Sequence, residues 1–144
     1  MAHTMPKICD HQDRYVCVND TTRGDNVKKM EIPTRRVMKI NSSCEEAQDW
    51  IITGDSEITM GILHDNKEYR IFPHFGDVQV GQRLIIGYDV SNQNHQNRKF
   101  TKKPLHCGGF HFISVVDPTL YIGVVDDHWA LTKTPHTWFL TYPI

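Results

Sequence analysis

Residues 137–141 read Thr-Trp-Phe-Leu-Thr, and two earlier segments share this pattern of a bulky aromatic side chain within a short β-forming run. The two are Asp49-Trp50-Ile51-Ile52-Thr53 and Arg98-Lys99-Phe100-Thr101-Lys102. The aromatic residues Trp50, Phe100 and Trp138 are separated by 50 and 38 residues, on either side of one third of the 144-residue chain. An element that returns at such intervals indicates a fold built from repeated units. The sequence therefore predicts three similar units.

A second recurring element supports the same division. Residues 14–18 (RYVCV), 68–72 (EYRIF) and 120–124 (LYIGV) each carry an aromatic residue at their second position. No window of the chain shows the 3.6-residue periodicity of an amphipathic helix, and turn residues separate the apolar runs. Twelve strands are predicted, at residues 7–9, 14–18, 36–40, 49–53, 58–63, 69–72, 83–88, 99–101, 110–116, 120–124, 129–132 and 138–141.

Three units of four strands predict an all-β fold, a β-trefoil of 12 strands with pseudo-threefold symmetry. In such a fold six strands close a barrel and six form hairpins that cap one end, so few strand edges stay exposed. We expect a single domain over residues 1–144, with residues 1–6 disordered or additional to the native chain. A chain of this length can bury a sizeable core without disulfides or metals.

The charge balance disfavours two classes of partner. Sixteen Lys and Arg against 17 Asp and Glu give a formal charge of −1, so we expect binding neither to nucleic acid nor to an anionic membrane surface. The charges are nevertheless clustered: residues 21–39 and 98–103 are basic, and residues 45–57 are acidic. Loop patches of opposite sign are a feature that a protein partner could recognise.

Catalytic and metal-binding motifs are not found in the sequence. The nine histidines form no H-E-x-x-H pattern, and G-x-S-x-G, P-loop and dinucleotide-binding glycine motifs do not occur. We therefore predict no enzyme activity, no catalytic residues, no metal and no cofactor. The four irregularly spaced cysteines are predicted to be free and mostly buried, and Cys9–Cys17 is the pair that would form a disulfide if one existed.

One stretch suggests a lineage. Residues 112–122 read Phe-Ile-Ser-Val-Val-Asp-Pro-Thr-Leu-Tyr-Ile, which resembles the C-terminal signature of the interleukin-1 family. The next residues, Gly123-Val124, depart from the usual family pattern and are similar to the interleukin-33 branch. Residues 98–112 resemble two consecutive family strands, and the resemblance extends over about residues 57–141. The matched signature positions are Phe112, Ser114, Pro118, Tyr121 and Ile122.

The resemblance implies a binding function without catalysis. Family members are cytokines or receptor antagonists that bind the immunoglobulin-like ectodomains of receptors through their loops, and Phe112, Tyr121 and Ile122 would fill the core. Lys103 aligns with a Lys of a family receptor-binding loop, so Asp55, Glu57, Lys102 and Lys103 are the predicted receptor-binding residues. The implied state is an extracellular monomer, released from the cytoplasm without a leader.

Other β-trefoils offer an alternative function. Gln48-Asp49-Trp50 matches the Q-x-W pattern of ricin-type lectins, and Arg23 or Lys67 could act as the basic residue of a protease-inhibiting loop. Q-x-W occurs once, however, where a lectin tends to repeat it. A β-trefoil lectin or protease inhibitor is therefore the second hypothesis.

Overall fold

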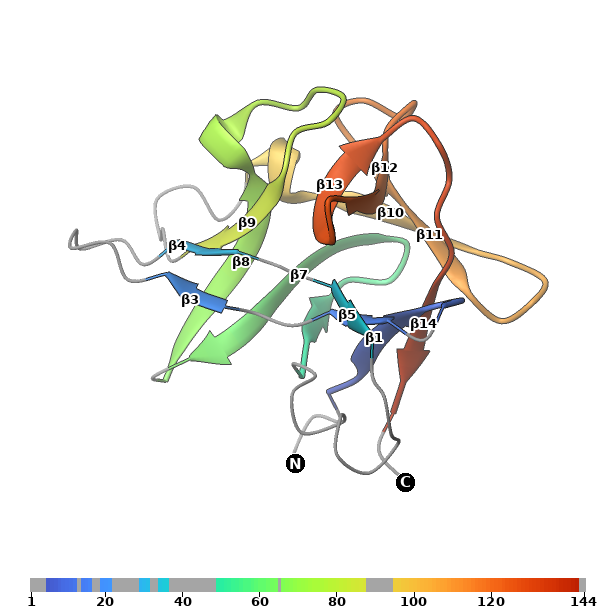
Figure 1. Ribbon diagram of the computed structural model, residues 1–144, viewed down its shortest axis with the longest axis horizontal. Coiled ribbons are helices and arrows are strands. Elements are labelled where there is room, and N and C mark those ends of the chain that lie inside the picture. The colour runs from blue at the N-terminus through green and yellow to red at the C-terminus, as the bar shows by residue number, and fades with distance from the viewer. Residues whose placement is uncertain are drawn as a thin grey trace.

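The computed structural model describes residues 5–12, 14–16, 19–21, 29–31, 34–36, 49–64, 66–87 and 95–142. Within them the chain is almost entirely strand, with short 3₁₀ turns at η1 (His74–Gly76) and η3 (Gln96–Arg98) (Figure 1). The strands are β1 (Lys7–Asp10), β2 (Arg14–Val16), β3 (Asn19–Thr21), β4 (Lys29–Glu31), β5 (Thr34–Arg36), β6 (Ile51–Thr53), β7 (Glu57–His64), β8 (Lys67–Pro73), β9 (Leu84–Gly87), β10 (Phe100–Pro104), β11 (Phe110–Ser114), β12 (Tyr121–Val125), β13 (His128–Thr132) and β14 (Trp138–Thr141).

The described strands join into one curled antiparallel sheet. Its main path runs β3-β4-β9-β8-β7-β10-β11-β14-β1-β2-β5, while β6 pairs with β7 and the β12–β13 hairpin attaches to β11. The first and last strands lie side by side, with Lys7 opposite Thr141 and Asp10 opposite Trp138. This pairing brings the two ends of the chain to the same side of the molecule (Figure 1).

Eleven of the twelve predicted strands coincide with described strands, and the predicted strand at residues 36–40 does not. β2 pairs with β5 and β3 pairs with β4, and the paired residue numbers add to 50 in both ladders, as in Tyr15↔Arg35 and Asp20↔Met30. One register therefore runs through both ladders, which contain the predicted strand at 14–18 on one side and the unpredicted strands β4 and β5 on the other. The predicted strand at 36–40 was placed too late in the chain: only Arg36 lies in β5, and residues 37–40 lie outside the described residues.

Strand registers confirm the predicted threefold equivalence of Trp50, Phe100 and Trp138. Phe100 lies opposite Ser114 and Trp138 lies opposite Asp10, while the β6–β7 register, continued by one residue, places Trp50 opposite Ile62. All three aromatic side chains are buried. The all-β, pseudo-threefold β-trefoil predicted from their spacing is therefore the fold of this chain.

The core is built mainly from the aromatic and branched residues of these strands. Trp129 stacks on Trp50 with ring centroids 5.3 Å apart, and its ring meets that of Trp138 edge to face at 5.4 Å. The Trp138 Nε1–H donates to the carbonyl of Ile122 at 2.9 Å, which satisfies its polar atom inside the core. Pro6 is also buried, and its carbonyl accepts the Trp50 backbone N–H. Pro6 therefore packs in the fold although it lies within the segment 1–6.

Candidate functional site

Three of the four predicted receptor-binding residues are exposed and the fourth is half-buried. Asp55 is exposed in the turn between β6 and β7, and Glu57 is exposed as the first residue of β7; Lys103 is exposed on β10 beside the half-buried Lys102. Backbone pairing brings the two segments together: Thr101 lies opposite Glu57, and the Lys102 N–H donates to the Ser56 carbonyl at 2.7 Å. The turn and the strand therefore form one continuous surface, called here the β7–β10 edge.

A glycine shapes the turn that presents Asp55. Gly54 has φ +104°, a conformation that side-chain-bearing residues rarely adopt, and an added Cβ would collide with the carbonyl of Glu57. The chain can therefore reverse tightly before β7, so that Asp55 and Glu57 lie beside β10.

The charged side chains of the β7–β10 edge make only weak interactions with their neighbours. Lys99 Nζ lies 3.6 Å from Glu57 Oε1, and Lys102 Nζ lies over the Phe110 ring, 5.2 Å from its centroid. Exposed ion pairs of this kind contribute little to stability, so their charges stay available to a partner. The arrangement can recognise charge; it brings together no nucleophile and base.

The β10–β11 hairpin extends this edge away from the barrel (Figure 1). Lys103 lies opposite His111, and the Leu105 N–H donates to the Gly109 carbonyl at 2.8 Å at the base of the loop. His106 and Cys107 are exposed in that loop. Neither Cys9 nor Cys107 forms a disulfide. The prediction of mostly buried thiols is wrong for Cys107, which occupies a solvent-facing hairpin loop, and Cys9 is half-buried. Cys17 and Cys44 lie outside the described residues.

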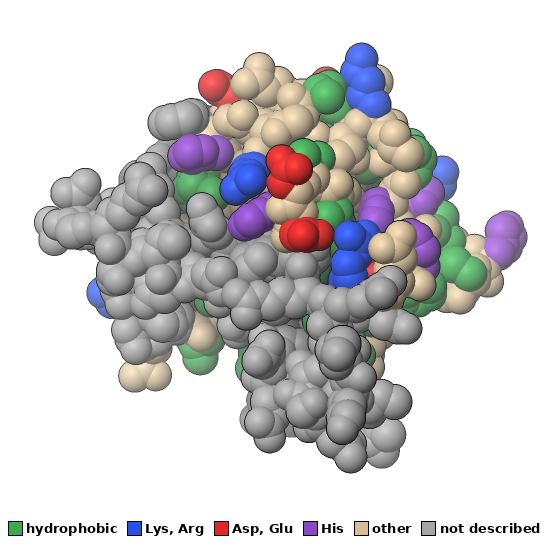
Figure 2. Space-filling view, viewed as in Figure 1, with side chains coloured by type: hydrophobic (Ala, Val, Ile, Leu, Met, Phe, Trp, Pro, Cys, Tyr) green, Lys and Arg blue, Asp and Glu red, His purple; other side chains and the backbone are tan. Residues whose placement is uncertain are grey.

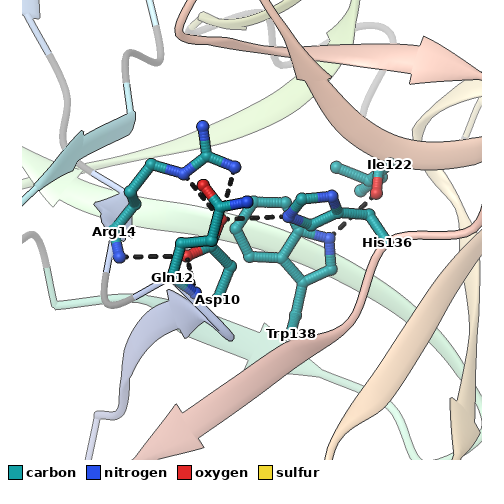
Figure 3. Close-up of polar contacts among 6 residues, drawn as sticks. All are labelled: Asp10, Gln12, Arg14, Ile122, His136 and Trp138. Carbon is teal, nitrogen blue, oxygen red and sulfur yellow. Dashed lines mark hydrogen bonds and ion pairs between the residues drawn. The ribbon is translucent and has the colours of Figure 1, made fainter.

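A buried polar cluster, shown in Figure 3, was not predicted. The Asp10 carboxylate, in a residue only 2% exposed, accepts backbone N–H groups of Gln12 and Arg14 on Oδ1, both at 2.9 Å. Its Oδ2 accepts Arg14 Nε and Nη2 at 2.8 Å and lies 3.0 Å from His136 Nε2. Burial alone would raise the pKa of Asp10, but the hydrogen bonds from His136, Arg14 and Gln12 together lower that pKa well below its usual range.

Asp10 could have been found only through the threefold alignment. Asp10 lies opposite Trp138, and the equivalent positions in the other two units, opposite Phe100 and Trp50, are Ser114 and Ile62. A charged residue at this position therefore occurs only in the first unit. The Ser114 Oγ accepts the Asp117 N–H at 3.2 Å, much as Asp10 accepts N–H groups of the turn that follows it. Both side chains thus stabilise a turn.

The interleukin-1-like signature occupies the corner from β11 to β12. Phe112 and Ile122 are fully buried, as the resemblance implied, and Leu120 is buried beside them. Tyr121 directly precedes Ile122 on β12 and so points to the opposite face of the sheet, where it is half-buried and its ring packs edge to face on His111, with centroids 5.5 Å apart. The expectation that Tyr121 fills the core is therefore wrong.

Two negative results concern the described residues alone. Across residues 5–142, apart from the stretches not described, no group of three or more His, Cys, Asp or Glu side chains could hold a metal ion. In the same part of the chain no helix is long and apolar enough to span a membrane.

Comparison with known proteins establishes the fold and no more. No protein-family model matches the chain, and no curated protein matches its sequence. The crystal structure of ThreeFoil, a designed threefold-symmetric protein, superposes with a TM-score of 0.69 at 10% sequence identity, covering 94% of this chain and 96% of ThreeFoil. A likeness of this extent at so low an identity identifies the chain as a β-trefoil.

Proposed function

We propose that this chain is an interleukin-1-family-like cytokine or receptor antagonist that binds immunoglobulin-like receptor ectodomains through its loops. The supporting observation is the β11–β12 corner. Ser114 accepts the Asp117 N–H, Asp117 accepts the N–H and hydroxyl of Thr119, and Pro118 lies between them in the turn. Each polar or proline position of the signature thus has a structural task in this chain.

The β7–β10 edge is the proposed receptor contact. It combines acidic Asp55 and Glu57 with basic Lys102 and Lys103 on adjacent segments, three of them exposed. Mixed charges at the rim of an interface act mainly on association rate and orientation. The proposal therefore assigns to this edge a role in partner choice rather than in chemistry.

A panel of interleukin-1-family receptor ectodomains, immobilised and tested by surface plasmon resonance, examines the proposal directly. We expect at least one ectodomain to bind, with an association rate that falls in Lys103→Glu and as the salt concentration rises. Lys67→Glu, which changes another exposed lysine, is the matched control and leaves the rate unchanged. A glycan array and a trypsin inhibition assay are expected to be blank. A specific glycan or protease signal without ectodomain binding would replace the proposal with the lectin or inhibitor hypothesis.

A further inference from the structure

A cavity lies beside β6, at the end of the barrel where both chain ends are drawn in Figure 1. Its volume is about 780 Å³, which is within the range of about 300–1,000 Å³ that small-molecule sites occupy. Five consecutive residues, 50–54, line it together with Met5 and Tyr142, the first and last residues that the structure describes. Pro6, Leu63 and Glu68 complete the lining. This space is called here the β6 cavity.

The rim of the β6 cavity is apolar although it faces solvent. Four large hydrophobic residues among those described are more than half exposed, and two of them, Leu63 and Tyr142, line this cavity. The other two, Val80 and Val116, do not line it. On the face drawn in Figure 2 the coloured hydrophobic side chains are instead interspersed with polar, charged and histidine side chains. Exposed apolar residues that gather around a hollow are typical of a ligand-binding site.

The threefold repeat shows that the barrel does not require apolar residues at this place. The two residues that follow the recurring aromatic position are Ile51 and Ile52 in the first unit, Thr101 and Lys102 in the second, and Phe139 and Leu140 in the third. Thr101 is exposed and Lys102 is half-buried, and both lie in ladders with the neighbouring strands. The second unit therefore builds the same part of the barrel with polar side chains, so the fold alone does not specify Ile51 and Ile52.

The polar groups of the β6 cavity interact with each other or with Arg70. Glu68 is the charged residue of the described lining, and its Oε1 lies 2.5 Å from Arg70 Nη2. Arg70 Nη1 also donates to the hydroxyl of Thr53, another lining residue, at 3.3 Å. An anionic ligand would meet the Glu68 carboxylate, and a cationic ligand would have to compete with Arg70 for it. The lining therefore favours a ligand without charge.

We infer that the β6 cavity is a binding site for a neutral, mainly apolar small molecule. Such a molecule would leave water on entering the cavity and would cover Leu63 and Tyr142 at the rim and Ile51 and Ile52 beside them. A small molecule fits better than a protein domain, because the apolar residues line a hollow that a folded domain cannot enter. The site uses none of the charges of the β7–β10 edge, so the inference is independent of the proposed receptor contact.

N-phenyl-1-naphthylamine is the probe, because it is neutral and apolar and fluoresces more strongly when it leaves water. The comparison ligand is 8-anilinonaphthalene-1-sulfonate, which has the same ring system with one added sulfonate. We expect the neutral probe to bind saturably, with one site per chain. The sulfonate should bind several-fold more weakly, because the described lining holds a carboxylate and no cation.

Substitutions at the rim locate the bound probe. Leu63→Gln and Tyr142→Ser should each weaken binding by about three- to tenfold, since each removes apolar area that the probe would cover. Both residues are exposed, so the fold should be kept, which near-UV circular dichroism checks. Val80→Gln and Val116→Gln are the matched controls: they change equally exposed residues outside the cavity and should leave binding unchanged.

Ile52→Lys tests the comparison between the units, because it gives the first unit the residue that the second unit has at Lys102. It should weaken probe binding by about tenfold or more, since it places a charge beside an apolar ligand. Leu63→Gln and Tyr142→Ser decide the question if Ile52→Lys disturbs the fold.

Four results would overturn the inference. The first three are unsaturable binding of the neutral probe, binding of the sulfonate that is equally tight, and losses in Val80→Gln and Val116→Gln as large as the loss in Leu63→Gln. The fourth is sedimentation of the protein with phosphatidylcholine vesicles that Leu63→Gln abolishes, because the apolar rim would then contact a membrane.

Discussion

His136 Nε2 lies 3.0 Å from Oδ2 of buried Asp10, although the two residues are 126 positions apart. Asp10 ends β1 and His136 precedes β14, so the contact links the first and last strands of the barrel. Since an ionised carboxylate only accepts hydrogen bonds, the imidazole Nε2 carries the proton that is shared. The contact therefore reinforces closure of the sheet beside the β1–β14 ladder (Figure 3).

Asp10→Asn should destabilise the protein by about 2–4 kcal/mol, because Arg14 and His136 lose a charged acceptor while the shape is kept. The expected cost is below that of a fully buried pair, since the Arg14 and His136 side chains remain 18% and 16% exposed. Urea denaturation at neutral pH measures the change. The control is Asp49→Asn, which removes the exposed pair with Lys7 and should cost less than about 0.5 kcal/mol. Equal effects of the two substitutions would contradict the importance of the cluster.

Acid should destabilise the wild type more steeply than Asp10→Asn. The pKa of Asp10 is lower in the folded protein than in the unfolded chain, so the unfolded state binds a proton first as the pH falls. The contribution of Asp10 is complete above the unfolded value, about 3.9, and is lost as the pH falls toward the folded one. The measurement is the urea midpoint between neutral pH and about pH 2. The stability of Asp10→Asn should still fall somewhat with pH, because hydrogen bonds from Thr119 also lower the pKa of Asp117. Parallel pH profiles for the two proteins would contradict this assignment.

The sequence predicted the aromatic positions that repeat in each unit. It missed the contacts that form only when the first and last strands pair and close the barrel. Trp50, Phe100 and Trp138 could be aligned because a buried aromatic position has a local signature in each unit. The Asp10–His136 contact has no such signature, since neither residue recurs in the other units and only the β1–β14 ladder brings them together.

The candidate site was predicted in part. Asp55, Glu57, Lys102 and Lys103 came from an alignment and a charge pattern, and their proximity follows from the β7–β10 pairing that no local signal encodes. Whether they contact a receptor remains a prediction. Tyr121 was misplaced because the resemblance assigned both Tyr121 and Ile122 to the core, although consecutive residues of a strand point to opposite faces of the sheet.

Phe112→Ala should cost about 3–5 kcal/mol, as a large-to-small change at a fully buried aromatic position. Thermal and urea unfolding measure it, with near-UV circular dichroism to show that the native fold is kept. Val116→Ala is the matched control: Val116 is 51% exposed, only four residues away, and its truncation should change stability by less than about 0.5 kcal/mol. A cost below about 1 kcal/mol for Phe112→Ala would mean that the β11–β12 corner contributes little to the core.

The last prediction is receptor binding with weak or absent agonism. In the family that this chain resembles, an agonist holds a primary receptor on one face and recruits an accessory chain on another, and antagonists lose the second contact. Here the connection between β13 and β14 spans only residues 133–137, and its His136 is held against Asp10. A short connection tied to the barrel has little reach toward a second receptor chain. Reporter cells carrying the cognate receptor pair should therefore show inhibition of an agonist and little activation by this protein alone, with Lys67→Glu behaving as wild type. Robust activation at low nanomolar concentration would show that accessory-chain recruitment does not need a longer loop at this position.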